Sequence, residues 1–137
     1  MRAGVKKLAH VAPVVAVSRV YETAPVGPTQ PDFLNAAALT TTELAPEKLL
    51  DELLAIESSL GRVRRERWGP RVIDLDVLWI EGVAVETPRL VVPHPHLLER
   101  AFALAPLLEL VPEATDPRTG ERYVVPAGDV RVTALRL

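Results

Sequence analysis

The feature that most constrains the fold is an apolar segment, residues 72–79, that carries two aspartates and directly follows an arginine-rich stretch. Side chains two residues apart project from the same face of a strand, so a strand here places Asp74 and Asp76 side by side, about 6–7 Å apart at the backbone. The opposite face is wholly apolar and is expected to pack on the core. Its members are Ile73, Leu75, Val77 and Trp79.

Two carboxylates on one face repel each other and resist desolvation unless a cation offsets their charge. Mg²⁺ prefers oxygen ligands and is typically held by one or two carboxylates plus substrate phosphates. Arginines upstream suit phosphate because a guanidinium stays charged and binds two oxygens at once. From the residues alone, solvated edge carboxylates and an arginine surface paired with Glu66 remain open alternatives.

Composition limits the class of protein. The 137 residues, 48% hydrophobic and 25% charged, predict one globular domain over residues 1–137. A net charge of −2 argues against a general binder of nucleic acid or anionic membranes. The absence of cysteine fits a reducing cytoplasm. The apolar stretch 8–17 is interrupted by His10 and Pro13 and is too short to span a bilayer.

The clearest secondary-structure signal is a helix that starts at Pro46, a position where a first helical turn tolerates proline. Glu47 follows with a charge that favours this end of a helix. One apolar stripe then continues through Leu49, Leu53, Ile56 and Leu60. Gly61 is expected to end the helix.

The remaining pattern mixes strands and helices. Alternation and β-branched residues predict strands over 14–21 and 35–43, and Glu81-Gly82 predicts a hairpin turn into 83–85. A second helix is expected over 97–110, divided or kinked at Pro106. Residues 1–10 have the spacing of a helix tail, and 116–120 are expected to form a turn. The order of elements predicts an α+β fold, with helices covering one face of a mainly antiparallel sheet.

Several motifs, taken in order, resemble one family. They occupy residues 21–27, 31–35, 61–64, 67–78 and 92–94, and the most specific is Arg-Trp-Gly-Pro-Arg-x-x-Asp-Leu-Asp at 67–76. Together they resemble 6-hydroxymethyl-7,8-dihydropterin pyrophosphokinase, an enzyme of folate biosynthesis, from about Val14 to Leu110. The resemblance implies a ferredoxin-like fold. It also implies transfer of the β,γ-diphosphate of ATP to the hydroxymethyl group of the reduced pterin, release of AMP, and two magnesium ions.

The same resemblance assigns roles to individual residues. Asp74 and Asp76 match the aspartates that hold both magnesium ions. The expected catalytic residues are Arg62, Arg64, Trp68, Arg71, Asp74 and Asp76. The expected ATP-binding residues are Glu57, Arg62, Arg64, Arg71, Arg89, His94 and Arg100. The expected pterin-binding residues are Thr23, Ala24, Val26, Phe33, Asn35 and Phe102, with the two phenylalanines sandwiching the pterin ring and Asn35 pairing with its polar edge. Phe33 stands where the family often has tyrosine.

One departure from the family pattern concerns the amino-terminal region. Family members begin with a strand that ends in a Gly-Ser-Asn turn, and this sequence has neither. A sheet without its first strand carries two ladders of unpaired backbone groups. A start assigned downstream, a truncation, or a gap filled by a rearranged or partner segment would each explain the difference. We expect a monomer, or a dimer if a partner compensates for the strand.

Two other functions stay open at this stage. A ferredoxin-like sheet that presents aromatics can bind single-stranded RNA, although the acidic balance and the absence of adjacent sheet aromatics argue against this. A non-catalytic relic that binds ATP or magnesium without pterin is the other, and the missing strand supports it. Without the joint pattern, Phe33 and Phe102 would be assigned to the core and His94 to a turn.

Overall fold

The computed structural model describes residues 1–23, 33–63, 73–128 and 130–137, except for the side chains of residues 33, 62 and 63. It confirms the α+β class. The elements, in chain order, are α1 (Arg2–Val11), β1 (Val14–Val17), β2 (Tyr21–Thr23), β3 (Phe33–Asn35), β4 (Ala38–Thr40), α2 (Pro46–Val63), β5 (Val85–Glu86), β6 (Val91–Val92), the 3₁₀ turn η1 (Leu97–Glu99), α3 (Ala101–Leu110) and β7 (Val130–Val132).

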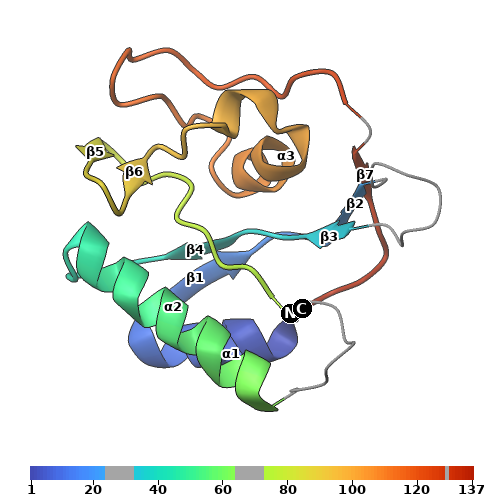
Figure 1. The fold of residues 1–137 in the computed structure, drawn as a ribbon. Helices are drawn as coiled ribbons and strands as arrows, with labels where there is room; N and C mark the ends of the chain where they lie inside the picture. The colour runs from blue at the N-terminus through green and yellow to red at the C-terminus, as the bar shows by residue number, and fades with distance from the viewer. Residues whose placement is uncertain (24–32, 64–72, 129) are drawn as a thin grey trace.

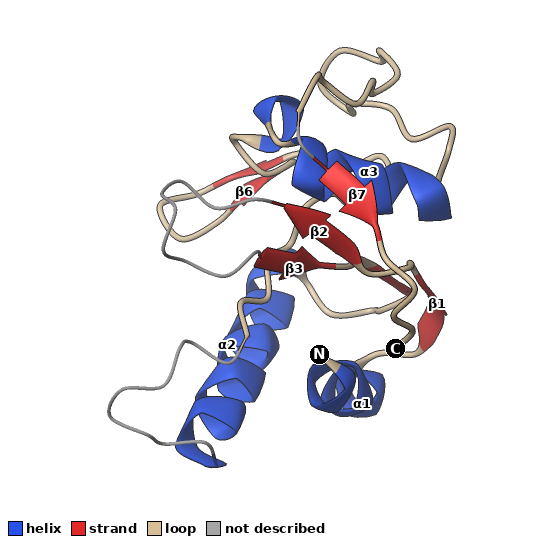
Figure 2. Cartoon of the chain, turned by 90° about the vertical axis from the view of Figure 1, so that its right-hand side faces the viewer, coloured by secondary structure: helices blue, strands red, loops and turns tan. Residues whose placement is uncertain are grey.

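The described strands form three small antiparallel sheets. β1 pairs with β4, β2 lies between β3 and β7, and β5 pairs with β6. Helices α1 and α2 lie on one side of the strand layer, whereas α3 lies on the other side, against β2 and β3 (Figures 1 and 2). The expectation that helices cover one face therefore holds for α1 and α2 and needs correction for α3.

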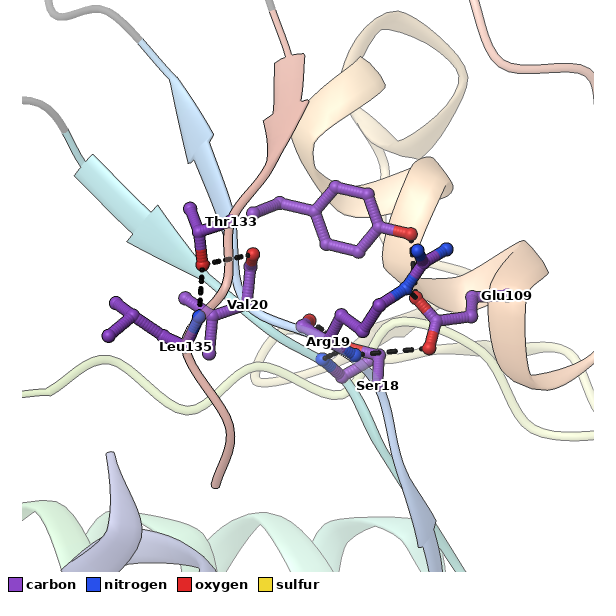
Figure 3. A network of polar contacts seen from close by, with 8 residues as sticks. Ser18, Arg19, Val20, Glu109, Thr133 and Leu135 are labelled. Carbon is purple, nitrogen blue, oxygen red and sulfur yellow. Dashed lines mark hydrogen bonds and ion pairs between the residues drawn. The ribbon is translucent and has the colours of Figure 1, made fainter.

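The predicted strand over 14–21 is divided at Ser18, which is buried. The Ser18 amide donates to the Ala37 carbonyl at 2.8 Å, and the Ala37 amide donates to the Ser18 hydroxyl at 2.8 Å (Figure 3). The hydroxyl stands where a regular ladder would use a backbone carbonyl. The ladder is thus interrupted on both strands at this point. Each of the two predicted strands therefore separates into two short strands.

Helix α2 confirms the prediction from periodicity, because all four residues of its apolar stripe are buried. The prediction that Gly61 ends the helix is wrong, since α2 continues to Val63. Gly61 is exposed and does not adopt a positive φ. A glycine in a helix costs about 1 kcal/mol relative to alanine, which is too little to stop a helix whose preceding turns are buried.

Residues 73–79 do not form the predicted strand. Within the parts of the chain that the structure describes, residues 73–77 make no backbone–backbone hydrogen bond to a neighbouring strand. The expected alternation is nevertheless present, because Asp74 and Asp76 are exposed while the apolar residues between them are half-buried. In the described parts of the chain, packing of its apolar side chains on the α2 core therefore takes the place of a sheet ladder over residues 73–77.

The apolar side chains gather in two cores that this segment connects. The α2 core consists of Leu49, Leu53, Ile56 and Leu60, with Leu8, Val11, Leu44, Ile73, Leu75 and Val77 packed against it. The α3 core consists of Leu97, Ala103, Leu104, Leu107, Ala114 and Tyr123, with Leu78, Trp79, Phe102, Leu108 and Val111 packed against it. Figure 1 shows the yellow-green segment passing across the strands from one core to the other.

The carboxy-terminal third contains confirmed turns and one strand that was not predicted. Gly82 and Gly120 have φ of +68° and +79°, in turns where the bridges Ile80–Val83 and Thr115–Arg122 bring the chain back on itself. The predicted helix over 97–110 is divided into η1 and α3, and Pro106 lies inside α3. β7 adds to the free edge of β2. No helix in the described ranges is both long and apolar enough to cross a membrane.

Candidate active site

The two site aspartates are presented on the exposed side of the segment that joins the two cores. Asp74 and Asp76 are exposed, and Leu75 between them turns its side chain toward the α2 core. The Leu75 amide donates a hydrogen bond to the Glu57 carboxylate, which comes from helix α2. The backbone between the two carboxylates is thus attached directly to the helix.

His94 lies beside this segment. Its backbone amide donates to the Leu78 carbonyl at 2.9 Å, and its Nδ1 accepts a hydrogen bond from the His96 amide at 3.2 Å. Burial lowers the pKa of His94, the positive charge of Arg100 lowers it further, and the negative charge of Asp76 acts in the opposite direction. The imidazole therefore lies within electrostatic reach of both a site carboxylate and a guanidinium.

Arg100 and Phe102 complete this group. Arg100 precedes the first residue of α3, and its guanidinium carbon lies 5.5 Å from the centre of the Phe102 ring. A cation at this distance from an aromatic ring is attracted by the electron density of the ring. The structure thus places Asp76, His94, Arg100 and Phe102 in one neighbourhood, although they come from three separate segments.

Arg89 is engaged elsewhere. Its guanidinium donates to the carboxylate of Asp51 on α2, and this hydrogen bond is the main reason that the pKa of Asp51 is lowered. The same loop is attached a second time, because the Thr87 hydroxyl donates to the Glu47 carboxylate at 2.6 Å. Both side chains of the Arg89–Asp51 pair are about half exposed, so the pair is a surface ion pair of the weak kind.

The expected pterin-binding residues come from elements that are neighbours in the fold. Thr23 is buried on β2 opposite Phe33 of β3, and Asn35 of β3 stands opposite Tyr21. Helix α3, which carries Phe102, packs against both strands. The elements that carry these residues are therefore neighbours in the fold.

Some predicted site residues lie outside the described residues. They are Ala24, Val26, Arg64, Trp68 and Arg71. Arg62 lies in the last turn of α2 and Phe33 begins β3, but their side chains are also outside the description. Their proposed roles stay predictions.

The donor set fits magnesium better than a metal that needs a protein cage. Asp74 and Asp76 supply exposed carboxylate oxygens. Within residues 1–23, 33–63, 73–128 and 130–137, no group of three or more His, Cys, Asp or Glu side chains could hold an ion by itself. Mg²⁺ keeps several waters and completes its shell with substrate phosphates, so two carboxylates are sufficient.

Sequence reasoning missed two contacts around the site. One is the Leu75–Glu57 hydrogen bond, and the other is the pairing of Arg89 with Asp51. The partners are a backbone amide and three charged side chains at exposed or half-exposed positions, which are common over much of the surface. The contacts join residues 18 and 38 positions apart, so no local pattern indicated them.

Paired carboxylates beside an imidazole and a guanidinium are the arrangement expected of an α+β protein that binds a metal–phosphate ligand. Residues 1–112 match the pattern of a family described as 7,8-dihydro-6-hydroxymethylpterin-pyrophosphokinase (HPPK). The chain therefore belongs to the HPPK family.

Similar proteins carry the corresponding name, 2-amino-4-hydroxy-6-hydroxymethyldihydropteridine pyrophosphokinase. The protein from Methylorubrum extorquens is 56% identical over 101 residues, which cover 73% of this chain and 64% of that protein. The protein from Synechocystis is 39% identical over 137 residues, covering 98% of this chain and 70% of its own length. The protein from Bacillus subtilis is 47% identical over 116 residues, covering 81% and 70%. The chain thus spans about two thirds of the length of these relatives.

Proposed function

We propose that this chain transfers diphosphate from ATP to the hydroxymethyl group of 6-hydroxymethyl-7,8-dihydropterin, giving AMP and the pterin diphosphate of folate biosynthesis. Family membership and the names of the relatives support the proposal. The observation that carries it is that the His94 amide bonds to the Leu78 carbonyl at 2.9 Å, which places the imidazole beside the aspartate segment, with Asp76 and Arg100 within electrostatic reach.

The reaction is a displacement at the β-phosphorus of ATP. The hydroxymethyl oxygen of the pterin forms the new bond to this phosphorus and gives up its proton to solvent. The bond from the β-phosphorus to the oxygen bridging it to the α-phosphate breaks, and that oxygen leaves with AMP. Such a transfer depends mainly on positioning and on charge stabilisation. Magnesium, when held by Asp74 and Asp76, would neutralise phosphate charge. We propose two magnesium ions, as the resemblance to the pyrophosphokinase family implies.

The chain's own residues would bind and orient both substrates. His94, Arg100 and Arg89 bind the triphosphate together with Arg62, Arg64 and Arg71. Arg89 is available for this because a surface ion pair with Asp51 is worth little against a phosphate.

The pterin would lie between the rings of Phe33 and Phe102. Asn35 bonds its polar edge, and Thr23, Ala24 and Val26 form the surrounding loop. Trp68 helps to close the site and exclude water, which limits hydrolysis of ATP. We further propose that residues 1–137 form one domain that works as a monomer in the cytoplasm.

The test is AMP formation by the 137-residue chain with ATP, magnesium and 6-hydroxymethyl-7,8-dihydropterin. A reaction without pterin and a reaction with a chelator in place of magnesium are the controls. We expect AMP only when all components are present. A folded protein that releases no AMP, or that releases it equally without pterin, would contradict the proposed function.

One observation favours a second candidate, a protein that binds magnesium–ATP without turning it over. Residues 73–77, which carry both aspartates, have no backbone partner strand in the described parts of the chain. A less firmly held carboxylate pair can bind a metal ion and still miss the reactive geometry. Binding of magnesium–ATP measured by calorimetry, combined with no AMP release, would identify this candidate.

A further inference from the structure

We infer that Glu57 is a positioning residue for the aspartate pair, acting through the backbone of Leu75, rather than a ligand of ATP. The inference rests on the proposed function insofar as that function gives the aspartates their role. Its structural basis is independent. The Glu57 carboxylate accepts the amide proton of Leu75, the one residue between Asp74 and Asp76.

This hydrogen bond gives the segment a directional contact with helix α2. In a sheet, ladder bonds fix how far a strand is shifted along its axis, but residues 73–77 make no ladder bond within the described residues. Packing of Ile73, Leu75 and Val77 on the α2 core fixes which face is buried. Apolar contacts are not directional, so they fix the shift less well than a hydrogen bond does.

The bond is also of the stronger kind. Its acceptor is a carboxylate, and hydrogen bonds to an ionised group are roughly twice as strong as neutral ones. The acceptor comes from a rigid element, because Glu57 lies between the buried residues Ile56 and Leu60 of the 18-residue helix α2. A group held in this way transmits the position of the helix to the carboxylates on either side of Leu75.

A matched control for substitutions at Glu57 is available on the same helix, at Glu52. Glu52 lies one and a half turns earlier on α2, where it lines a groove with Lys7 and His10 of α1. Glu52→Gln removes a negative charge from the same helix without touching the aspartate segment. Glu57→Gln keeps an oxygen that can accept the Leu75 proton, whereas Glu57→Ala removes the acceptor.

The first measurement is amide hydrogen exchange, followed by NMR in protein free of metal and nucleotide. In Glu57→Ala the Leu75 amide should exchange about tenfold faster, as expected for the loss of a charge-assisted hydrogen bond, and the signals of Asp74 and Asp76 should shift. Glu57→Gln should change the exchange rate of Leu75 less, and Glu52→Gln should leave it unchanged. Unchanged exchange at Leu75 in folded Glu57→Ala would overturn the inference.

The second measurement is binding of Mn²⁺, used as a paramagnetic substitute for Mg²⁺ and followed by electron paramagnetic resonance without nucleotide. Glu57→Ala should weaken binding about tenfold, and Glu57→Gln should stay within about twofold of the wild type, because only the alanine variant loses the acceptor. If Glu57 were a ligand of ATP, Glu57→Ala would weaken ATP binding and leave Mn²⁺ binding unchanged, and the inference would be wrong.

Failure of the proposed function would look different. Wild-type protein that binds Mn²⁺ but releases no AMP contradicts the proposed reaction, while the ratio of Mn²⁺ affinities between wild type and Glu57→Ala still decides the role of Glu57. If the wild type binds no Mn²⁺, the aspartates are not a metal site and the inference is overturned together with the proposed function.

Discussion

Asp76 is the exposed side chain on which the proposed reaction depends most directly. Replacing it with alanine should lower pterin-dependent AMP release at least about a hundredfold, because a metal ligand supplies several kcal/mol of charge stabilisation. The stability of the fold should hardly change, since the side chain is exposed. Activity and thermal unfolding measured on the same samples check both expectations.

The control for this substitution is Glu81→Gln, which removes an exposed negative charge from the turn that follows the segment. It should behave like the wild type in both measurements. Near-normal activity of Asp76→Ala would remove the aspartate from the mechanism.

His94 reports on the geometry of the site through its titration. Its pKa should lie below the ordinary 6.5, mainly because of burial. Arg100→Ala should raise this pKa, because a positive neighbour is lost, and Asp76→Asn should lower it further, because a negative neighbour is lost. The chemical shift of the imidazole carbon-bound proton, followed by NMR against pH, gives the three values.

Glu52→Gln on the far side of helix α2 should leave that titration unchanged. If Asp76→Asn instead raised the pKa of His94, or left it unchanged, the two side chains would not be neighbours in solution.

At the scale of elements, helix α2 is the part of the fold that the sequence determines most strongly. Leu53 is 7% exposed and its neighbour Leu54 is 46% exposed, so the two leucines form a matched pair. Leu53→Ala should lower the free energy of unfolding by about 2–5 kcal/mol, because it leaves a cavity in the α2 core. Leu54→Ala should change it by less than about 1 kcal/mol. Urea unfolding of both variants tests this, and equal effects would contradict the burial of one face.

Besides its packing on the strands, helix α3 bonds through the Glu109 carboxylate to residues at or just before the start of β2. Glu109 accepts hydrogen bonds from the Tyr21 hydroxyl at 2.7 Å, the Arg19 amide at 3.0 Å and the Arg19 guanidinium at 3.2 Å (Figure 3). Burial by itself would raise the pKa of Glu109, but these three donors outweigh it and hold the pKa below its ordinary value.

The lowered pKa of Glu109 predicts how stability depends on pH. As the pH falls, the unfolded chain takes up this proton before the folded one, so the contribution is complete above about pH 5 and is lost as the pH falls through the folded pKa. Glu109→Gln should therefore lower the free energy of unfolding by about 1–2 kcal/mol at pH 7 and by less at pH 3. Urea unfolding at both pH values checks this, with Glu113→Gln as the exposed control. A difference that stays constant with pH would contradict it.

Local signals predicted the elements that local interactions stabilise. The stripe of α2, the glycine turns and the alternation of residues 73–77 follow from neighbours within a few positions. The division of two strands at Ser18 and Ala37 could not be predicted, because it depends on hydrogen bonds between residues 19 positions apart in the sequence. The motif predicts a set of candidate site residues, whereas the pairing of Arg89 with Asp51 depends on the folded surface.

At the scale of the whole molecule, the carboxy-terminal strand β7 pairs with the edge of β2 that β3 leaves open. β7 pairs with residues 21–23, and Thr133 donates from both its amide and its hydroxyl to the carbonyl of Val20 at 2.9 Å. Residues 130–132 alternate two valines with an arginine, but this strand signal is short and the partner strand lies more than a hundred positions earlier. The sequence pattern therefore did not predict which strand this segment pairs with.

Removing residues 129–137 should expose an edge of β2 and the buried side chain of Val20, and lower the free energy of unfolding by about 2 kcal/mol or more. A chain that ends at Thr133 keeps β7 and should lose less than about 1 kcal/mol. Comparing the urea midpoints of the two shortened proteins with the full chain tests the role of the strand. Equal midpoints for the two would show that β7 contributes little.

The first and last residues of the chain lie side by side (Figures 1 and 2). The Arg2 guanidinium donates to the Arg136 carbonyl at 3.0 and 3.3 Å. If this chain were inserted into a surface loop of a host protein, its two ends would meet the host at almost the same point. The host loop would therefore not have to stretch. The same closeness allows the ends to be joined and new ends to be opened at an exposed turn such as Gly120. The fold is therefore suited to serve as an inserted cassette or to be circularly permuted.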